Sequence, residues 1–246
     1  MKRLLGTVAE GTIVKMYENG SYADFIVARH NYDRSSNGTG HTMMVRKSIL
    51  PEKKNWGSAL YGTSTKTDLN WYYDSALPDW LADTYSKRLD PAVRARVKPM
   101  RIYQYGSYES IPFRVPRSGD FNWGYGVDRN QTFSDEALNI LKTTYEGMFW
   151  LTDTDRHSYT TNDDPPITYE YGRASSMRYD AFHDGWYSNY VESDSEYGVL
   201  PCFLLYDDLC LGDDGILRAN RVPEITSVYF GTNSVHGKKT PFKLPY

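Results

Sequence analysis

Cysteine is scarce in this chain of 246 residues, in which only Cys202 and Cys210 occur. Two cysteines make no disulfide framework, and these two lack the paired spacing of a zinc site. Cys202 lies in an apolar run and is expected to be a small buried residue. The sequence therefore predicts no metal site, and no motif for a cofactor is present.

Positive charge is also limited, with 28 Lys and Arg against 31 Asp and Glu. Nucleic-acid binding needs a clustered excess of basic residues, so a net charge of −3 argues against a nucleic-acid partner. Long apolar runs are missing as well. The opening MKRLLGTVAEGTIV has a short apolar run interrupted by Glu10, too short for a signal peptide or a membrane span. We expect a soluble protein that is made in the cytoplasm and does not insert into membranes.

Signatures of catalysis are missing too. No phosphate-binding loop, nucleophile elbow or zinc-enzyme motif occurs. Acids such as Asp153, Asp184 and Glu192 show no spacing that singles out a catalytic pair. His157 and His183 would each need an orienting partner to act as a general base. The sequence therefore predicts that the protein is not an enzyme.

The first half of the chain contains signals for both strands and helices. Two β-prone runs joined by Asn19-Gly20 predict a hairpin over 11–30, because this pair suits a turn that needs positive φ twice. A third strand is expected over 41–50. Apolar spacing and capping residues predict three helices, over 75–85, 90–97 and 134–147.

The second half is expected to consist of strands and long loops. Strands are predicted over 148–154, 185–191 and 197–205. The polar segment from Asp155 to Glu170 is expected to be a loop. Loops of this length in a compact domain are usually functional or disordered, which directs attention to this half of the chain.

A boundary is expected between a domain over 1–218 and a tail over 219–246. The tail contains four basic residues, one acidic residue, three prolines and one β-prone run, EITSVYF. This composition predicts an extended basic C-terminal arm that becomes ordered against a neighbouring subunit by strand addition. A tail folded back on its own domain is the alternative.

The order of these elements resembles a poorly characterised domain family of phages and prophages of gut bacteria. The resemblance covers most of residues 6–216 and is most specific in the opening hairpin and in the closing stretch. There, Gly198, Val199, Pro201 and Phe203 match a recurrent G-V-R-P-x-F/L pattern that an Asp-Gly turn follows. This chain has Leu200 where the family usually has Arg, so any contact made by that Arg is missing.

The resemblance implies an α+β protein with a C-type-lectin-like fold. Small twisted antiparallel sheets would be flanked by two to three helices, with long loops that hold the ligand. Retroelement-diversified receptor-binding proteins and formylglycine-generating enzymes have related folds. The latter use a reactive cysteine pair, whereas Cys202 and Cys210 lie outside the loop region. Residues 162–165 are similar to lectin calcium loops, but a solvated turn is the simpler interpretation.

Tyrosine is abundant, with 22 residues, and many lie between Asp155 and Tyr197 among Ser, Asp, Asn and His. This is the composition of an antibody paratope, and it also suits sugar recognition. The alternative is that these tyrosines pack within strands, and Trp150, Trp186 and Tyr197 are expected in the core. The predicted ligand-binding residues are Tyr159, Tyr169, Tyr171, Tyr179, His183, Asp184, Tyr187, Asn189 and Tyr190.

Together, the composition and the resemblance predict a bacteriophage virion structural protein, on the head or the tail, that binds a host-surface glycan or protein. The C-terminal arm would contact other virion proteins or sister subunits in a homo-oligomer, with a trimer as one option. Two alternatives stay open. One is a purely architectural decoration or baseplate subunit, and the other is a polysaccharide depolymerase.

Overall fold

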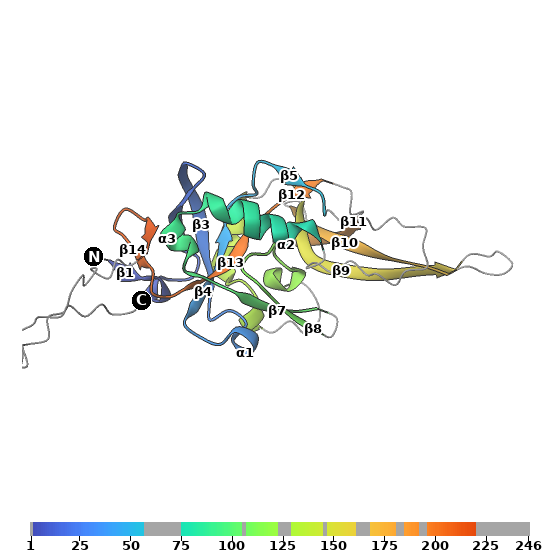
Figure 1. The fold of residues 1–246 in the computed structure, drawn as a ribbon, viewed down its shortest axis with the longest axis horizontal. Helices are drawn as coiled ribbons and strands as arrows, with labels where there is room; N and C mark the ends of the chain where they lie inside the picture. Colours follow the sequence, from blue (N-terminus) through green and yellow to red (C-terminus); the bar gives the residue numbers. More distant parts are fainter. Residues whose placement is uncertain are drawn as a thin grey trace, which may run out of the picture.

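The computed structural model describes residues 2–56, 75–104, 107–122, 129–144, 147–160, 168–180, 185–191 and 196–219. Within them the chain is a mixed α+β protein of small, mostly antiparallel sheets and a few short helices, as expected. The predicted arm lies outside the described residues apart from Ala219. In Figure 1 the described chain forms a body from which one long hairpin extends.

The first five-stranded sheet lies in the body and has the order β2-β3-β4-β13-β6, with all neighbours antiparallel. The predicted opening hairpin is confirmed, because Asn19 and Gly20 join β2 to β3 with φ angles of 49° and 88°. The closing strand β13 lies beside β4. The bounds are β2 Ile13–Glu18, β3 Ser21–His30, β4 His41–Arg46, β6 Val97–Lys98 and β13 Cys202–Tyr206.

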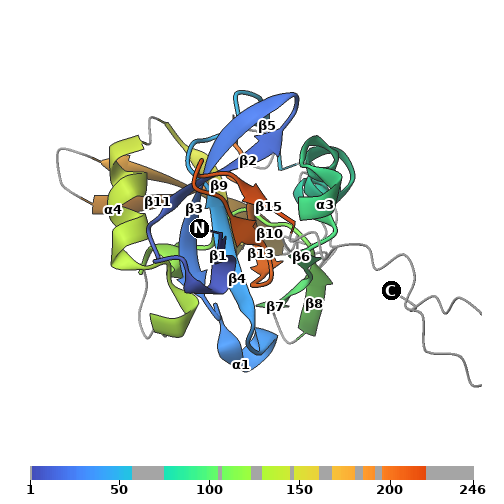
Figure 2. The same cartoon turned by 90° about the vertical axis from the view of Figure 1, so that its left-hand side faces the viewer.

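Helical segments lie on both sides of this sheet, with α3 and α4 at opposite sides of the body in Figure 2. All three predicted helices are confirmed at their first residues by caps. Ser75, Asp90 and Ser134 accept hydrogen bonds from backbone N–H groups two or three residues later. The bounds are α1 Arg34–Asn37, α2 Ala76–Trp80 with a π turn Leu81–Tyr85 and a 3-10 turn Ser86–Arg88, α3 Pro91–Arg94, and α4 Asp135–Thr144.

The second five-stranded sheet has the order β11-β10-β9-β12-β5 and includes the projecting hairpin, drawn in yellow and orange in Figure 1. The expected loop from Asp155 to Glu170 is wrong for most of its length, because β9 and β10 continue on either side of residues 161–167. Apolar and polar residues do not alternate there, so the usual strand signal is missing. The bounds are β5 Lys53–Lys54, β9 Phe149–Thr160, β10 Thr168–Asp180, β11 Gly185–Val191 and β12 Tyr197–Gly198.

Two smaller sheets complete the described chain. One brings the first strand beside the last two, in the order β1-β14-β15, and the other is the hairpin β7-β8. The bounds are β1 Arg3–Leu4, β7 Met100–Gln104, β8 Ser107–Ile111, β14 Cys210–Leu211 and β15 Leu217–Arg218. Short 3-10 turns occur at Leu5–Thr7, Ser118–Phe121 and Arg129–Gln131.

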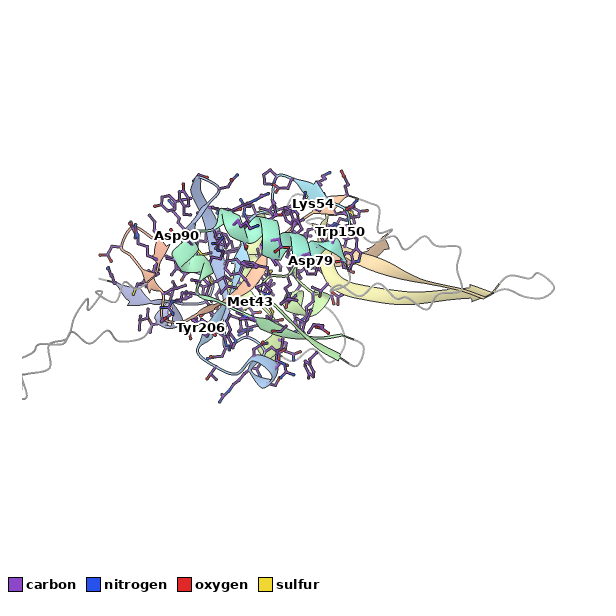
Figure 3. All side chains as sticks on the ribbon, viewed as in Figure 1. Met43, Lys54, Asp79, Asp90, Trp150 and Tyr206 are labelled. Atoms are coloured by element: carbon purple, nitrogen blue, oxygen red, sulfur yellow. The ribbon has the colours of Figure 1, made fainter. Side chains whose placement is uncertain are left out.

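Two apolar clusters form the core of the body. Cys202 and Trp150 are fully buried, as predicted, and Trp186 is also buried, while Tyr197 is half-buried against the core. In Figure 3, Trp150 lies where the projecting hairpin joins the body. Its indole N–H donates to the backbone carbonyl of Lys54 at 2.6 Å, which ties β9 to β5. The core therefore extends to the base of the hairpin.

Candidate binding surface

The candidate binding surface is the three-stranded part of the second sheet formed by β9, β10 and β11, called here the ribbon. Seven of the nine predicted ligand-binding residues lie in these strands. Tyr159 is in β9, three tyrosines are in β10, and the rest are in β11. His183 and Asp184 lie outside the described residues. The residues in β10 are Tyr169, Tyr171 and Tyr179, and those in β11 are Tyr187, Asn189 and Tyr190.

The strand register brings several of these positions together. Tyr169 pairs with Tyr159, and Tyr171 pairs with His157. Residues paired across an antiparallel ladder share a face, and so do residues two apart along one strand. The four positions therefore lie on one face of the projecting part of the ribbon, an arrangement that sequence alone did not reveal.

Nearer the body, the side chains of the ribbon divide into buried and exposed sets. Tyr187 is 43 % exposed and pairs with the exposed Arg178 across the strands. Tyr179 is half-buried, with its ring centroid 5.2 Å from that of Trp186 and the Lys142 ammonium 5.9 Å above it. Tyr187 is thus available for contact, whereas Tyr179 also packs against the core.

Trp186 anchors β11 to the body. Its ring lies 4.4 Å from Phe121 and 6.3 Å from Phe149 between centroids, in tilted and edge-to-face arrangements. Because β11 pairs with β10 along its whole length, this anchor holds both strands. The sequence signal was a Trp in a β-prone run, and it correctly indicated a core residue.

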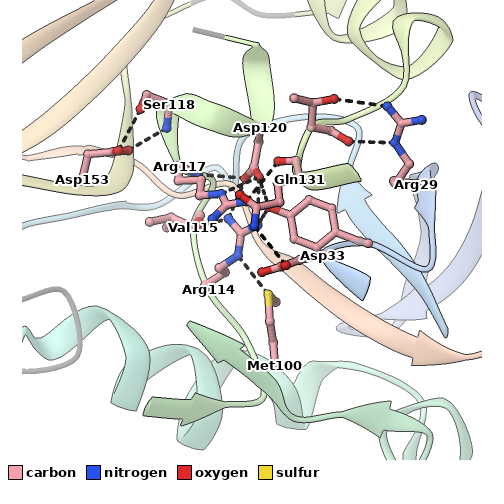
Figure 4. Close-up of polar contacts among 12 residues, drawn as sticks. Arg29, Asp33, Met100, Arg114, Val115, Arg117, Ser118, Asp120, Gln131 and Asp153 are labelled. Carbon is pink, nitrogen blue, oxygen red and sulfur yellow. Dashed lines mark hydrogen bonds and ion pairs between the residues drawn. The ribbon is translucent and has the colours of Figure 1, made fainter. Parts of the chain in front are cut away.

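A buried ionic network, which sequence reasoning missed, lies beside the ribbon base (Figure 4). Arg114 and Asp120 are both fully buried and form a two-pronged pair, with N–O distances of 2.6 and 3.0 Å. The hydroxyl of Tyr32 donates to Asp120 and accepts from Arg114. Arg114 is also fixed to the interior strand β13, since its backbone exchanges two hydrogen bonds with Cys202. An Arg between Phe113 and Val115 was the only sequence signal.

Charge pairing sets the ionisation of this network. Burial alone would raise the pKa of Asp120, but Arg114 and Arg117 hold it below its ordinary value. Burial and the nearby Asp120 carboxylate raise the pKa of Tyr32, so its hydroxyl stays protonated. All five N–H donors of Arg114 are engaged, including one with the sulfur of Met100 at 3.1 Å. The network therefore has a structural role.

The network holds the segment that clamps β9. The backbone N–H of Arg117 donates to Asp120 at 2.9 Å, which fixes the turn that follows. From this turn Ser118 donates two hydrogen bonds to the Asp153 carboxylate, at 2.6 and 2.8 Å. Thr152 donates its N–H to Pro116 at 2.8 Å. The β9–β10 register is irregular at this point, where β9 bonds to Pro116 and Ser118.

A small polar cavity of about 210 Å³ lies beside this clamp, lined by Asp33, Arg101, Arg114, Arg117 and Asp153 among others. Burial raises the pKa of Asp153, and the hydrogen bonds from Ser118 oppose that rise. A second hollow, of about 340 Å³, lies in the first sheet region between the exposed rings of Tyr17 and Tyr22 and the helix α3. Both hollows mix acidic and basic groups.

His41 is a buried histidine in the first sheet whose ionisation affects stability. Its Nε2 lies 2.9 Å from the carbonyl of Tyr32, and the ammonium of Lys98 lies 3.1 Å from its Nδ1. Burial lowers the pKa of His41, and Lys98 lowers it further, while the carbonyls of Tyr32 and Thr39 and the Asp207 carboxylate oppose this. The imidazole is therefore neutral in the folded protein at neutral pH.

We expect the free energy of unfolding to fall as the pH is lowered below about 6.5. In that window the unfolded chain protonates His41 but the folded chain does not, so acid favours unfolding. The slope should reach at most about 1.4 kcal/mol per pH unit for this one group. Urea unfolding between pH 8 and pH 5 measures it. The His41→Gln variant should lose this part of the pH dependence, and an unchanged slope would assign it to other groups.

The remaining chemistry of the described residues is limited. Cys202 and Cys210 are free, buried thiols, and burial raises the pKa of Cys202, which makes it unreactive. Among the described residues, no three His, Cys, Asp or Glu side chains cluster so as to hold a metal ion. Residues 162–165 lie outside them. No helix in the described part of the chain is long and apolar enough to cross a membrane.

Comparisons with protein-family models, with curated proteins and with solved structures find no match. The class of protein is therefore defined by its own architecture. It is an α+β protein in which, among the described residues, one of two five-stranded sheets extends beyond the body as a ribbon. The ribbon is anchored by Trp186 and clamped at Asp153.

Proposed function

We propose that the protein is a non-enzymatic binding protein that contacts its partner through the ribbon. The observation that carries this proposal is the extension of β9 and β10 beyond the body, with tyrosine and histidine positions paired on one face. A projecting element adds little to a core, so its sequence is free to serve contact. The clamp at Asp153 and the anchor at Trp186 hold the ribbon in a fixed direction, which lowers the entropic cost of binding.

The proposed ligand is a glycan or protein on a cell surface. Tyrosine offers a large contact area with few rotatable bonds, and the small polar residues between the tyrosines supply hydrogen bonds. Tyr187 and Arg178 present the same chemistry nearer the body, on the opposite face of the ribbon, because Arg178 is an odd number of residues from Tyr171 along β10. Flat aromatic faces beside polar groups suit pyranose rings.

We further propose that the protein is a bacteriophage virion component with a C-type-lectin-like fold. This rests on the resemblance of the opening hairpin and of the closing stretch around Gly198, Val199, Pro201 and Phe203. Helices on both sides of a small antiparallel sheet are compatible with such a display scaffold. The projecting element is a strand pair for most of its length, where the resemblance implies a long loop.

The test is binding of labelled protein to intact cells of gut bacteria and to their purified surface polysaccharides. The variant Tyr159→Ala/Tyr169→Ala/Tyr171→Ala removes three aromatic rings from the projecting part of the ribbon. We expect saturable binding by the unmodified protein and at least a tenfold weaker Kd for the variant, since aromatic contacts dominate binding energies (about 1.4 kcal/mol or more).

Tyr108→Ala is the matched control, because Tyr108 is an exposed strand tyrosine, 51 % accessible, in the separate β7–β8 hairpin. It should bind like the unmodified protein. Equal binding by the triple variant would place the contact elsewhere on the molecule. Absence of binding by folded protein would favour an architectural subunit, and release of reducing ends from the polysaccharides would establish a depolymerase instead.

A further inference from the structure

Strand β11 forms one edge of the ribbon. In the sheet order it pairs with β10 on one side, and among the described residues no strand pairs with its other side. Its seven residues, GWYSNYV, include no charged residue and no proline. An edge strand presents a row of backbone N–H and C=O groups that can pair with another strand.

The other sheet edges in the described chain are protected in recognisable ways. Edge strands β5 and β6 are two residues long and each contains lysine. The edge of β2 is covered, because the backbone N–H of Lys15 donates to the carbonyl of Gly215 at 2.8 Å and the backbone N–H of Asp90 donates to the carbonyl of Tyr17 at 3.2 Å. Short length, lysine and coverage are the devices that prevent edge pairing. Strand β11 has none of them within the described residues.

The remaining long edges contain charges within the strand. The projecting part of β9 includes Asp155 and Arg156, while β7 and β8 include Arg101 and Glu109. Like charges placed opposite each other destabilise a strand pair, so two copies of such an edge repel in the register that places the same charged residue opposite itself. Two copies of β11 meet no such repulsion in any register. This uncharged edge is therefore suited to an identical partner.

The position of β11 is also fixed before any partner arrives. Trp186 packs on Phe121 and Phe149, and β11 pairs with β10 from Gly185 to Val191. A strand held in this way loses little further freedom when a second strand adds to it. The exposed Tyr187 lies on the edge strand itself, on the same face as its neighbour Arg178 in β10, and would lie beside the partner's strand.

We infer that β11 pairs antiparallel with β11 of a second copy of this chain, joining the two ribbons into one continuous sheet. A twofold axis needs only one surface, which is then used by both copies. If the strands pair along their whole length, the axis passes beside Ser188, the middle residue of Gly185–Val191. The inference concerns self-association and does not depend on the ligand proposed for the ribbon.

The first experiment measures the mass of the unmodified full chain by light scattering at micromolar concentrations, without cells or polysaccharide. We expect a dimer that dissociates on dilution. Tyr187→Lys places a lysine on the edge of both copies and should weaken the dimer by about tenfold or more in Kd. Tyr187→Thr removes the ring but keeps a β-prone, uncharged residue, and it should still form the dimer.

A control variant and a cross-link complete the test. Tyr108→Lys makes the same change at an exposed strand tyrosine of β8 and should leave the dimer unchanged. Ser188→Cys should form a disulfide-linked dimer on mild oxidation, whereas Ser110→Cys on β8 should not. The native thiols are buried and should not interfere. A monomer throughout, a trimer, or a dimer insensitive to Tyr187→Lys would overturn the inference.

The outcome of the cell-binding experiment is independent of the outcome of the self-association experiment. A protein that binds cells but stays monomeric would retain the proposed function and lose the β11 pairing. A dimer that binds no cells would retain the pairing and favour an architectural role. Capture of an extended segment of another protein by a monomeric chain would show that the edge accepts a different strand, and the inference would then be wrong.

Discussion

Replacing Asp120 with asparagine should lower the free energy of unfolding by about 3–5 kcal/mol. The carboxylate is fully buried and neutralises the buried Arg114, with which it forms two bonds of 2.6 and 3.0 Å. Asn keeps the shape but not the charge, so the guanidinium would be left uncompensated in a site of low dielectric. Urea or guanidinium unfolding of the two proteins at pH 7 measures the difference.

An exposed pair of the same chemistry provides the control. Asp214 and Arg218 form a two-pronged bond at 2.8 and 2.7 Å, but about half of each side chain is exposed. Water solvates both groups after Asp214→Asn, so that variant should unfold much like the unmodified protein. Equal effects of the two substitutions would show that burial does not determine the importance of the Asp120 pair. Exchanging both Arg114 and Asp120 for apolar residues should recover part of the loss.

Trp186→Ala should cost about 3–5 kcal/mol of unfolding free energy. The indole is buried against Phe121, Phe149 and Tyr179, and its removal leaves a large void at the base of the ribbon. The same substitution at the next residue, Tyr187→Ala, removes an exposed ring and should change stability by at most about 0.5 kcal/mol. Denaturant unfolding of both variants makes this comparison within one strand.

Trp186 and Tyr187 should also differ in their effect on amide exchange, because Trp186 anchors β11 whereas Tyr187 is an exposed contact residue. Trp186→Ala should increase amide exchange along β11, because the strand would then be held mainly by its pairing with β10. Tyr187→Ala should leave exchange in β11 unchanged. If both variants exchange alike, the anchor lies elsewhere in the ribbon base.

Local signals in the sequence predicted much of the body. The Asn19-Gly20 turn and the caps at Ser75, Asp90 and Ser134 all act within a few residues, and each is confirmed. Burial of Cys202 and Trp186 followed from the apolar and β-prone runs that contain them. Such features can be predicted because the residues that interact to form them lie close together in the sequence.

The features that sequence did not predict depend on distant partners. The Arg114 pair is stabilised by Tyr32, 82 residues away, and such a contact leaves no periodic pattern. In the ribbon, residues 155–160 and 168–170 form strands where the sequence indicates a loop, because a strand that lacks an apolar face lacks the alternation by which strands are recognised. Which of its positions share a face depends on the register, for example of Tyr159 with Tyr169, and one sequence does not reveal that register.

The irregularity where the ribbon leaves the body bears on how the ribbon could vary in length. Between the Ser176–Trp150 and Ala174–Thr154 pairs, β9 advances by four residues while β10 advances by two. The difference is even, so the alternation of faces passes through the junction unchanged. Insertions or deletions of two residues in each strand would therefore change the reach of the ribbon by about 7 Å without turning its tyrosine positions to the other side. The length of the ribbon and the residues on its faces can thus change independently of each other, while the body stays the same.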